Sequence, residues 1–415
     1  MDNDMKENMS QLYFCDFAFS EKEKEKIYFS AAWFNGLVEA NTKTGNANII
    51  AKFVGERNIV GMLHSEILYL NNKLYFCPRN TNYFSMYDLE KKEMKTWNIP
   101  DNEKYWLEKD GKFYKIIPKG NFIYLLPYNY NQILCFDVEN EIFIVYESWF
   151  NEFVQKFSYK YKEKNHDWIF WEYLIDENLF ISKIIGFDYF MVFHTETGKV
   201  SFIEWIGKKI VSVEQSDKKP SLIDEDGGCW EYNIDREKFE KKCDLKISVK
   251  NISQRFIREK DIFYLLSNIK NEMILYNVRN NNIKQISFHT KEKLHSNCLG
   301  TVWAFINFFL KRVENKLFIL SKTNELIEFD MDLESYSSIK FRLDSELPRL
   351  DCKLEQFNLK NYYEKWRYFP YVFCDIGTYI NIIKDFDREK KENSVGNYGK
   401  CIFNILKNGE KIKKN

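Results

Sequence analysis

The stretch Lys73–Trp97 reads KLYFCPRNTNYFSMYDLEKKEMKTW. It holds an apolar strand with Tyr and Phe, a short polar segment, and a second strand that ends in an aromatic residue followed by Asp88. A turn of acidic and basic residues comes next. Aromatic and β-branched residues bounded by polar turns are typical of β-strands. This stretch therefore predicts consecutive antiparallel strands joined by tight turns.

The same pattern recurs along the chain. Good copies begin at Asn121, Asn178, Ile262 and Asn315, and weaker ones at Lys26 and Ser221. The polar residue after the aromatic of the second strand gives a ruler with spacings of 47, 49, 57, 39, 44 and 53 residues. The ruler residues are Asn41, Asp88, Asp137, His194, Asn233, Asn277 and Asp330. Propeller blades repeat every ~40–50 residues. Helical solenoids have similar periods, but these segments are short and rich in Ile, Phe, Tyr and Val.

The repeat predicts an all-β fold: a β-propeller of about seven four-stranded blades, with six or eight as the alternatives. Inner strands are expected at Ser65–Leu70, Trp168–Ile175 and Thr301–Phe309. The amino-terminal strand Gln11–Phe19 either serves as the first inner strand or lies beside the last blade. We expect each Asp or Asn of the ruler to accept hydrogen bonds from backbone amides about two residues on, forming the turn.

The sequence after about Leu350 departs from the repeat. We therefore divide the chain into a propeller, residues 1–349, and a tail, residues 350–415, that packs on the propeller. Within the tail, Leu354–Phe369 has a partly helical pattern. Closure of the ring by this tail is the alternative to closure by the amino-terminal strand.

Bulk properties exclude several classes of protein. The 61 basic and 61 acidic residues cancel, which argues against a nucleic-acid partner. Met1–Ser10 lacks the pattern of a secretory signal, and no apolar run has the length of a membrane span. The nine cysteines are scattered without a CxxC pair, which is typical of reduced thiols. We expect a cytoplasmic protein, a monomer with no membrane span.

The motifs "LYF" and "YDLE" of the clearest blade, and the ending Gly399-Lys400-Cys401-Ile402, are soft but span most of the chain. On them the chain resembles uncharacterised kelch-like and WD-like propellers of low-GC Gram-positive bacteria. Gly227–Gly228 with Trp230 and Tyr232 resembles the kelch signature at a different spacing. The resemblance implies a fold and no established activity, so it assigns no site residues.

Motifs that carry chemistry are missing. His289, His295 and Cys298 lack the second ligand pair of a zinc site. The acidic run that starts at Asp224 lacks the alternating ligands of a calcium loop, and an acidic turn explains it better. No nucleophile elbow or phosphate-binding loop occurs. We assign no catalytic, cofactor-binding or metal residues and expect no cofactor. Whether the protein is an enzyme stays open, with the balance toward no.

Aromatic residues give the remaining hypothesis. Most of the ten Trp are expected to pack between blades. Trp168 and Trp171 flank an inner-strand segment with Glu172, and Trp106 lies in a loop that enters another. We expect these four residues on a ligand face. The favoured function is non-catalytic binding of a protein or peptide through the loop face or the channel mouth. The alternative is a carbohydrate-binding or carbohydrate-active propeller.

Overall fold

The computed structural model describes sixteen stretches of the chain. They are residues 14, 16–20, 25–31, 35–56, 63–100, 111–128, 130–146, 148–161, 170–176, 178–184, 187–214, 220–267, 270, 272–289, 310–320 and 325–343. The chain divides into two units, Met1–Ser345 and Glu346–Asn415, and the described residues all belong to the first. The predicted boundary near Leu350 and the predicted helical segment Leu354–Phe369 lie outside the described residues, so both stay predictions.

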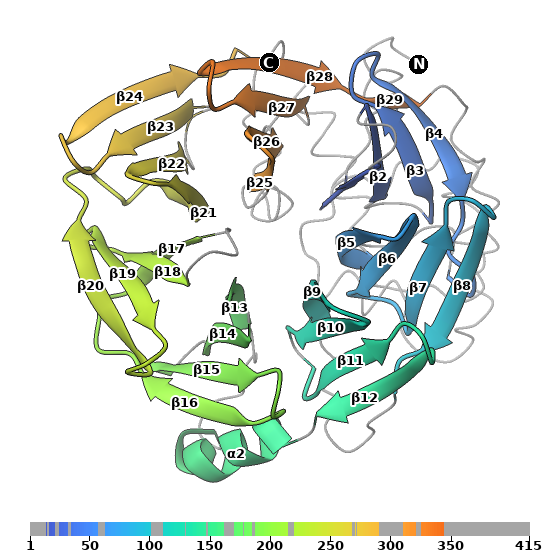
Figure 1. Ribbon diagram of the computed structural model, residues 1–415, viewed down its shortest axis with the longest axis horizontal. Coiled ribbons are helices and arrows are strands. Elements are labelled where there is room, and N and C mark those ends of the chain that lie inside the picture. The colour runs from blue at the N-terminus through green and yellow to red at the C-terminus, as the bar shows by residue number, and fades with distance from the viewer. Residues whose placement is uncertain are drawn as a thin grey trace, which may run out of the picture. The chain divides into compact units, whose positions relative to one another are not determined.

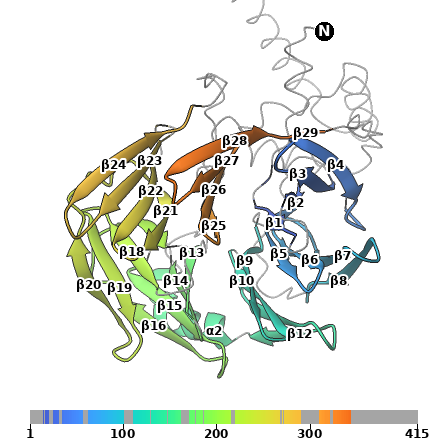
Figure 2. The same ribbon diagram turned by 45° about the horizontal axis from the view of Figure 1, so that its top comes forward.

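The described strands form seven blades, each of four consecutive antiparallel strands. The inner strands of the fifth and sixth blades, β17 (Ile210–Glu214) and β21 (Ile252–Glu259), also pair in parallel and join these two blades in one eight-stranded sheet. Figures 1 and 2 show the blades arranged around a common axis, with the first strand of each blade innermost. The all-β propeller predicted from the repeat is therefore confirmed.

The strands fall into four layers from the axis outward. The innermost strands are β1 (Ala18–Phe19), β5 (His64–Leu70), β9 (Phe113–Lys119), β13 (Phe170–Ile175), β17 (Ile210–Glu214), β21 (Ile252–Glu259) and β25 (Leu310–Val313). The second strands are β2 (Lys26–Ser30), β6 (Lys73–Pro78), β10 (Phe122–Pro127), β14 (Leu179–Ile184), β18 (Ser221–Asp224), β22 (Ile262–Ser267) and β26 (Lys316–Leu320). The third strands are β3 (Leu37–Asn41), β7 (Tyr83–Asp88), β11 (Ile133–Asp137), β15 (Tyr189–His194), β19 (Gly228–Asn233), β23 (Glu272–Asn277) and β27 (Glu325–Asp330). The outer strands are β4 (Asn46–Ala51), β8 (Glu93–Asn98), β12 (Ile142–Tyr146), β16 (Val200–Glu204), β20 (Lys238–Asp244), β24 (Asn282–Ser287) and β28 (Ser335–Lys340).

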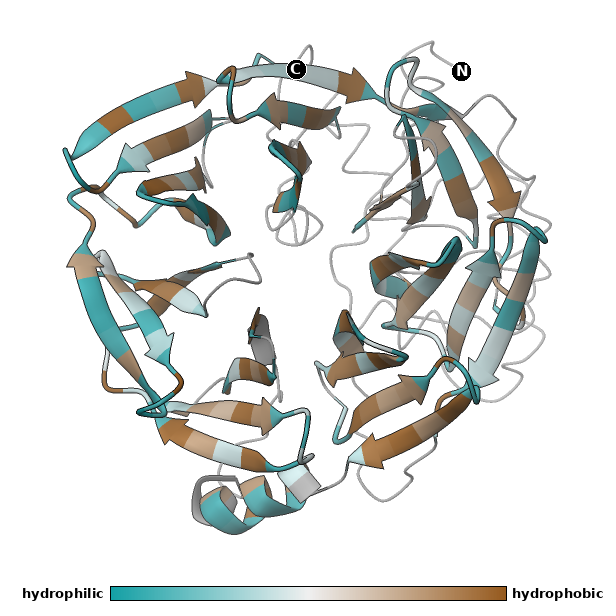
Figure 3. Ribbon diagram, viewed as in Figure 1, coloured by the Kyte–Doolittle hydropathy of each residue, from teal (hydrophilic) through white to brown (hydrophobic). Residues whose placement is uncertain are grey.

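Seven hydrophobic clusters hold the ring together, one between each pair of successive blades. The cluster that closes the circle packs Phe14, Phe17 and Phe29 of the first blade against Phe318 and Leu326 of the last. Hydrophobic positions recur along the strands of every blade (Figure 3). A small sheet with two apolar faces buries both only by stacking against a neighbour on each side, which is why the ring closes.

The third strand of each blade ends at the ruler residue of that blade. In four blades with Asp or Asn at this position, Oδ1 accepts bonds from the amides two and three residues on. At Asp88 the donors are the amides of Glu90 and Lys91, at 3.0 and 2.9 Å. These bonds lower the pKa of the Asp88 carboxyl. The same turn occurs at Asn41, Asp137 and Asp330, with single bonds at Asn233 and Asn277. The structural role expected for the ruler is confirmed at these positions.

The fourth residue after the ruler is left-handed in all seven blades. The residues and their φ angles are Gly45 (79°), Lys92 (57°), Glu141 (56°), Gly198 (66°), Glu237 (48°), Asn281 (55°) and Glu334 (48°). A side chain in this conformation brings Cβ close to the following carbonyl oxygen. In five blades this residue is not glycine, so the turn between the third and fourth strands is strained.

Lys92→Gly is therefore expected to raise the free energy of unfolding by up to about 1 kcal/mol. Glycine removes the Cβ clash, and its larger entropy in the unfolded chain offsets part of the gain. Lys91→Gly, one residue earlier at a position without positive φ, should lower stability by about 0.5–1 kcal/mol. Urea unfolding of both variants measures the difference, and a change of the same sign in both would contradict the strained turn.

The ring closes through its first and last blades. The short strand β29 (Arg342–Leu343) leaves the last blade and pairs in parallel with the outer strand β4 of the first. The amide of Arg342 donates to the carbonyl of Gly45 at 2.8 Å. At the inner side, β1 pairs with β2, and Phe14 bridges Ala31. The first of the two roles predicted for Gln11–Phe19, a first inner strand, is confirmed for its described residues.

One detail differs from the sequence prediction. Helix α2 (Ser148–Tyr161) follows β12 and was not predicted. Its Trp149, Phe153 and Phe157 are buried between the third and fourth blades. The inner strand predicted at Thr301–Phe309 lies outside the described residues, and the described inner strand of the last blade is β25. Among the described residues, no helix has the length and apolar character needed to cross a membrane.

Candidate functional site

The pairing between the first and second strands shifts register in six blades. In the second blade, for example, His64 pairs with Pro78 and Ile67 with Phe76. The two inner-strand residues between these pairs, Ser65 and Glu66, therefore lie opposite the single residue Cys77 of the second strand. The shift always falls at the carboxy-terminal end of the second strand. The inner-strand residues that fall within the shift, and so have no one-to-one partner on the second strand, are Asp16–Phe17, Ser65–Glu66, Tyr114, Trp171–Glu172, Val211 and Ser253–Arg255. Arg255 pairs instead with Val213 of the neighbouring inner strand β17. In the last blade, the residues that would pair at this level lie outside the described stretches.

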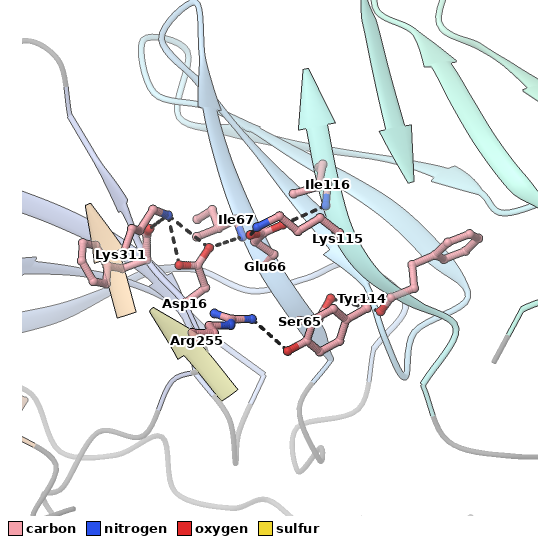
Figure 4. A network of polar contacts seen from close by, with 11 residues as sticks. Asp16, Ser65, Glu66, Ile67, Tyr114, Lys115, Ile116, Arg255 and Lys311 are labelled. Atoms are coloured by element: carbon pink, nitrogen blue, oxygen red, sulfur yellow. Dashed lines mark hydrogen bonds and ion pairs between the residues drawn. The ribbon is translucent and has the colours of Figure 1, made fainter. Parts of the chain in front are cut away.

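A bulge turns a side chain away from its regular direction and releases backbone groups from the ladder. Repeated at one level around the ring, it gathers side chains from distant parts of the sequence near the axis. Figure 4 shows side chains from the bulges of four blades together with the neighbouring Lys115 and Lys311, and the contacts among them. We call the following residues the inner belt: Asp16, Glu66, Tyr114, Lys115, Arg255 and Lys311.

Asp16 connects three blades. The Nζ of Lys311, in the last blade, donates to Asp16 Oδ1 at 3.0 Å, to Oδ2 at 3.3 Å and to the carbonyl of Phe17 at 2.6 Å. Asp16 Oδ2 also accepts from the amide of Ile67 in the second blade, at 3.0 Å. The Asp16 side chain is 10% exposed and that of Lys311 32%. The acidic side chain thus links the first blade to both of its neighbours.

Glu66 repeats this arrangement one blade further on. Its Oε2 accepts from the amide of Ile116 at 2.8 Å, and its Oε1 pairs with Lys115 Nζ at 2.6 Å. The Ser65 hydroxyl donates to the Phe113 carbonyl at 3.1 Å. Ile67 and Ile116 hold equivalent positions in their inner strands. In two successive blades, therefore, a carboxylate from the bulge of one blade accepts a hydrogen bond from the equivalent backbone amide of the next.

Tyr114 and Arg255 join opposite sides of the ring. Arg255 Nη2 donates to the Tyr114 hydroxyl at 2.8 Å, although the residues belong to the sixth and third blades. The Tyr114 ring also stacks with Tyr128, with ring centroids 5.8 Å apart. The guanidinium of Arg79 lies 5.5 Å from the centre of the Tyr128 ring. Two stacked rings therefore lie between two guanidinium groups at this side of the belt.

Hydrogen bonds and ion pairs hold both carboxylates of the belt. Oxygens of both carboxylates accept backbone amide hydrogens and ion-pair with lysines. Two acids against three cations leave one formal positive charge. Partly buried side chains held by such bonds are preorganised, so a ligand would meet them with little loss of side-chain entropy.

The structure places the four residues of the sequence-predicted ligand face as follows. Trp171 and Glu172 lie in the bulge of β13, at the level of the inner belt, and only their backbone is described. By register, Glu172 is the counterpart of Glu66. Trp106 and Trp168 lie outside the described residues. Sequence reasoning missed all six belt residues. One signal was present: Glu66 and Lys115 stand 49 residues apart, one repeat period.

The sequence offered two other candidate sites: the acidic run at Asp224, and the group His289, His295 and Cys298. The Asp224 carboxylate accepts from the amides of Asp226 and Gly228, at 3.0 and 2.8 Å, and from Trp230 Nε1 at 2.8 Å. It therefore builds an acidic turn, as the sequence favoured. His295 and Cys298 lie outside the described residues. Within the described stretches, no group of three acidic, His or Cys side chains is placed to hold a metal ion.

Comparisons with known proteins identify the class of fold. No protein family model and no curated protein matches the chain. Among solved structures, YCF48 from Cyanidioschyzon merolae matches with a TM-score of 0.52 and 9% identity, over 80% of this chain and 96% of that one. Kluyveromyces lactis Hsv2 matches with a TM-score of 0.45 and 12% identity, over 81% and 100% of the two chains. PorZ, a surface component of the type-IX secretion system of Porphyromonas gingivalis, matches at 0.47 and 10%, over 81% of this chain and 39% of that one.

At 9% identity, the likeness to YCF48 shows the fold alone. The chain is a β-propeller, an architecture that commonly serves as a binding scaffold.

Proposed function

We propose that this propeller is a non-catalytic binding protein that engages a protein or peptide segment at the inner belt, at the mouth of the central channel. The observation that carries the proposal is the bulge repeated at one level in six blades. Bulges are enriched beside functional sites, because they re-aim side chains and end regular pairing. A fold stabilised by inter-blade clusters alone has no need of a register shift at the same level in six inner strands.

The belt's chemistry suits a polar, extended segment. Arg255, Lys115 and Lys311 donate hydrogen bonds to carbonyl and carboxylate groups, and Tyr114 offers a ring face. The single excess positive charge favours a segment that presents an acidic side chain or backbone carbonyls. We further propose that the protein acts in the cytoplasm as a monomer and belongs with kelch-like bacterial propellers. The four described cysteines, which are free thiols, support the cytoplasmic assignment.

A carbohydrate ligand is the second candidate. The stacked pair Tyr114–Tyr128 favours it, because sugar rings pack on aromatic faces. A glycan array separates the two candidates: binding of a defined sugar that is lost in Tyr114→Ala would favour carbohydrate recognition.

The proposal is tested by affinity capture from the organism that encodes the chain, followed by titration of the captured partner. We expect Arg255→Ala to weaken binding at least tenfold, equivalent to about 1.4 kcal/mol, because it removes a guanidinium from the belt. Arg279→Ala is the matched control. Its guanidinium pairs with Asp261 at 2.6 Å and its side chain is 79% exposed, in the turn after β23.

Binding by Arg279→Ala should stay within twofold of the unaltered protein. The proposal fails if no stoichiometric partner is captured, or if the two variants lose the same affinity.

A further inference from the structure

Two cysteines face each other in the fifth blade. Cys229 on β19 and Cys243 on β20 are direct partners across the antiparallel pair. Such partners have Cα atoms about 4.5–5.5 Å apart and point to the same face of the sheet. Disulfides join Cα atoms about 4.4–6.8 Å apart. The backbone therefore holds these residues at a separation that a disulfide spans without movement of the strands.

The two side chains also influence each other's titration: Cys229 lowers the pKa of the Cys243 thiol. The other two described cysteines differ. Cys135 on β11 is buried, and its cross-strand partners are Tyr124 and Ile144. Cys77 on β6 is buried near Ser65. Among the cysteines of the described stretches, only Cys229 and Cys243 form a pair.

The surroundings divide the chemical roles between the two thiols. Cys243 is partly exposed, and its neighbour Cys229, aided by the nearby Arg258 guanidinium, lowers the pKa of its thiol. Cys229 is buried, and its neighbour Cys243 together with burial raises the pKa of its thiol. The thiolate is the attacking form of cysteine, so Cys243 is the first to react with an oxidant and Cys229 the second.

We propose that Cys229 and Cys243 are a redox modification site, a dithiol that is oxidised reversibly to an intramolecular disulfide by a small disulfide of the glutathione class. The Cys243 thiolate attacks one sulfur of the oxidant. The oxidant's S–S bond breaks, and one glutathione leaves as its thiolate. Cys229 then loses its proton to that thiolate and attacks the mixed disulfide at Cys243, releasing the second glutathione. Two electrons and two protons pass from the cysteine pair to the oxidant, which is reduced to two thiols.

The inference is independent of the inner belt and of any binding partner. The disulfide would tie the outer strand β20 to β19, beside the cluster that joins the fifth and sixth blades.

The test uses the full chain, incubated with oxidised glutathione, alkylated at its remaining thiols and digested for mass spectrometry. We expect a peptide that joins residues 229 and 243, lighter by two hydrogens than the reduced pair, and its loss on treatment with dithiothreitol. Recovery of both cysteines as alkylated peptides from folded protein would overturn the proposal. A disulfide from Cys243 to any other cysteine would overturn it as well. The unaltered protein suffices for this decision.

Three variants then assign the order of attack. Cys229→Ser should stop at the mixed disulfide and keep one glutathione on Cys243. Cys243→Ser should reduce the joined product to background, with residue 229 left unmodified by glutathione. Cys135→Ser, the control at a buried cysteine without a cysteine partner, should form the joined peptide at the unaltered yield. Glutathione on residue 229 of Cys243→Ser at the rate seen for Cys243 would contradict the assigned order.

Discussion

Gly45→Ala is expected to lower the free energy of unfolding by about 2–4 kcal/mol, because the added methyl meets the closure of the ring. Gly45 has φ +79°, and a Cβ placed on it would lie 2.6 Å from the carbonyl oxygen of Lys340 at the end of β28. The backbone of Lys340 leads directly into β29, so the clash cannot be relieved by a side-chain rotation. The strain of a left-handed alanine and the overpacking each contribute about 1–2 kcal/mol.

Gly120→Ala separates the two contributions. Gly120 also has a positive φ, +58°, but nothing lies within 4 Å of the Cβ position. In this variant the free energy of unfolding should fall only by the strain of a left-handed alanine, about 1–2 kcal/mol. Urea unfolding gives both values, and hydrogen exchange at the Arg342 amide reports the closure itself. Equal losses in the two variants, with unchanged exchange at Arg342, would show that β29 does not hold the ring closed.

The second large effect concerns pH and His64. This residue begins β5, beside the inner belt, and is fully buried between Phe53 and Phe76, with ring centroids 4.3 and 5.2 Å away. Its Nδ1 lies 2.9 Å from the Ser30 hydroxyl, and Nε2 has no hydrogen-bond partner. Burial lowers the pKa of His64 to about 3 from the ordinary 6.5.

Because the folded pKa lies below the unfolded one, the unfolded chain binds a proton first as the pH falls. Stability is therefore lost below pH ~6.5 and continues to fall until the folded pKa is reached. Between pH 6.5 and 4.5 we expect His64 alone to remove about 2 kcal/mol from the free energy of unfolding.

His64→Asn should remove this part of the pH dependence, since an amide does not titrate. His194→Asn is the control: it removes a histidine from a ruler position where other blades carry Asn or Asp. Urea unfolding at several pH values between 6.5 and 4.5 measures all three proteins. Parallel curves for the unaltered protein and His64→Asn would show that the buried imidazole does not carry the effect.

The sequence predicted the ring well because its signal is periodic and local. Each ruler residue follows an aromatic at the end of a strand, and the turn that it forms needs only its own amide neighbours. Helix α2 was missed because its Trp149, Phe153 and Phe157 resemble the aromatic content of the strands around them. Their helical spacing over a single short segment did not stand out.

The inner belt could not be found in the same way. A bulge adds one residue to a strand without changing its composition, so pattern reading does not detect it. Tyr114 and Arg255 form a hydrogen bond across the ring although 141 residues separate them in the sequence. A contact between residues so far apart in the sequence leaves no local motif. The prediction that Trp171 and Glu172 belong to an inner strand was right: both lie at the bulge of β13. A role in ligand binding stays a prediction.

The central proposal is that a partner binds at the inner belt. Site-specific photo-cross-linking tests it most directly, with the photoreactive residue at Gln254 in the bulge of β21 or at Ile283, which is 46% exposed on the outer strand β24. With the captured partner at saturation, the account predicts a covalent adduct from position 254 and none from position 283. A partner that stays bound yet forms its adduct only from position 283, or from neither position, would contradict it.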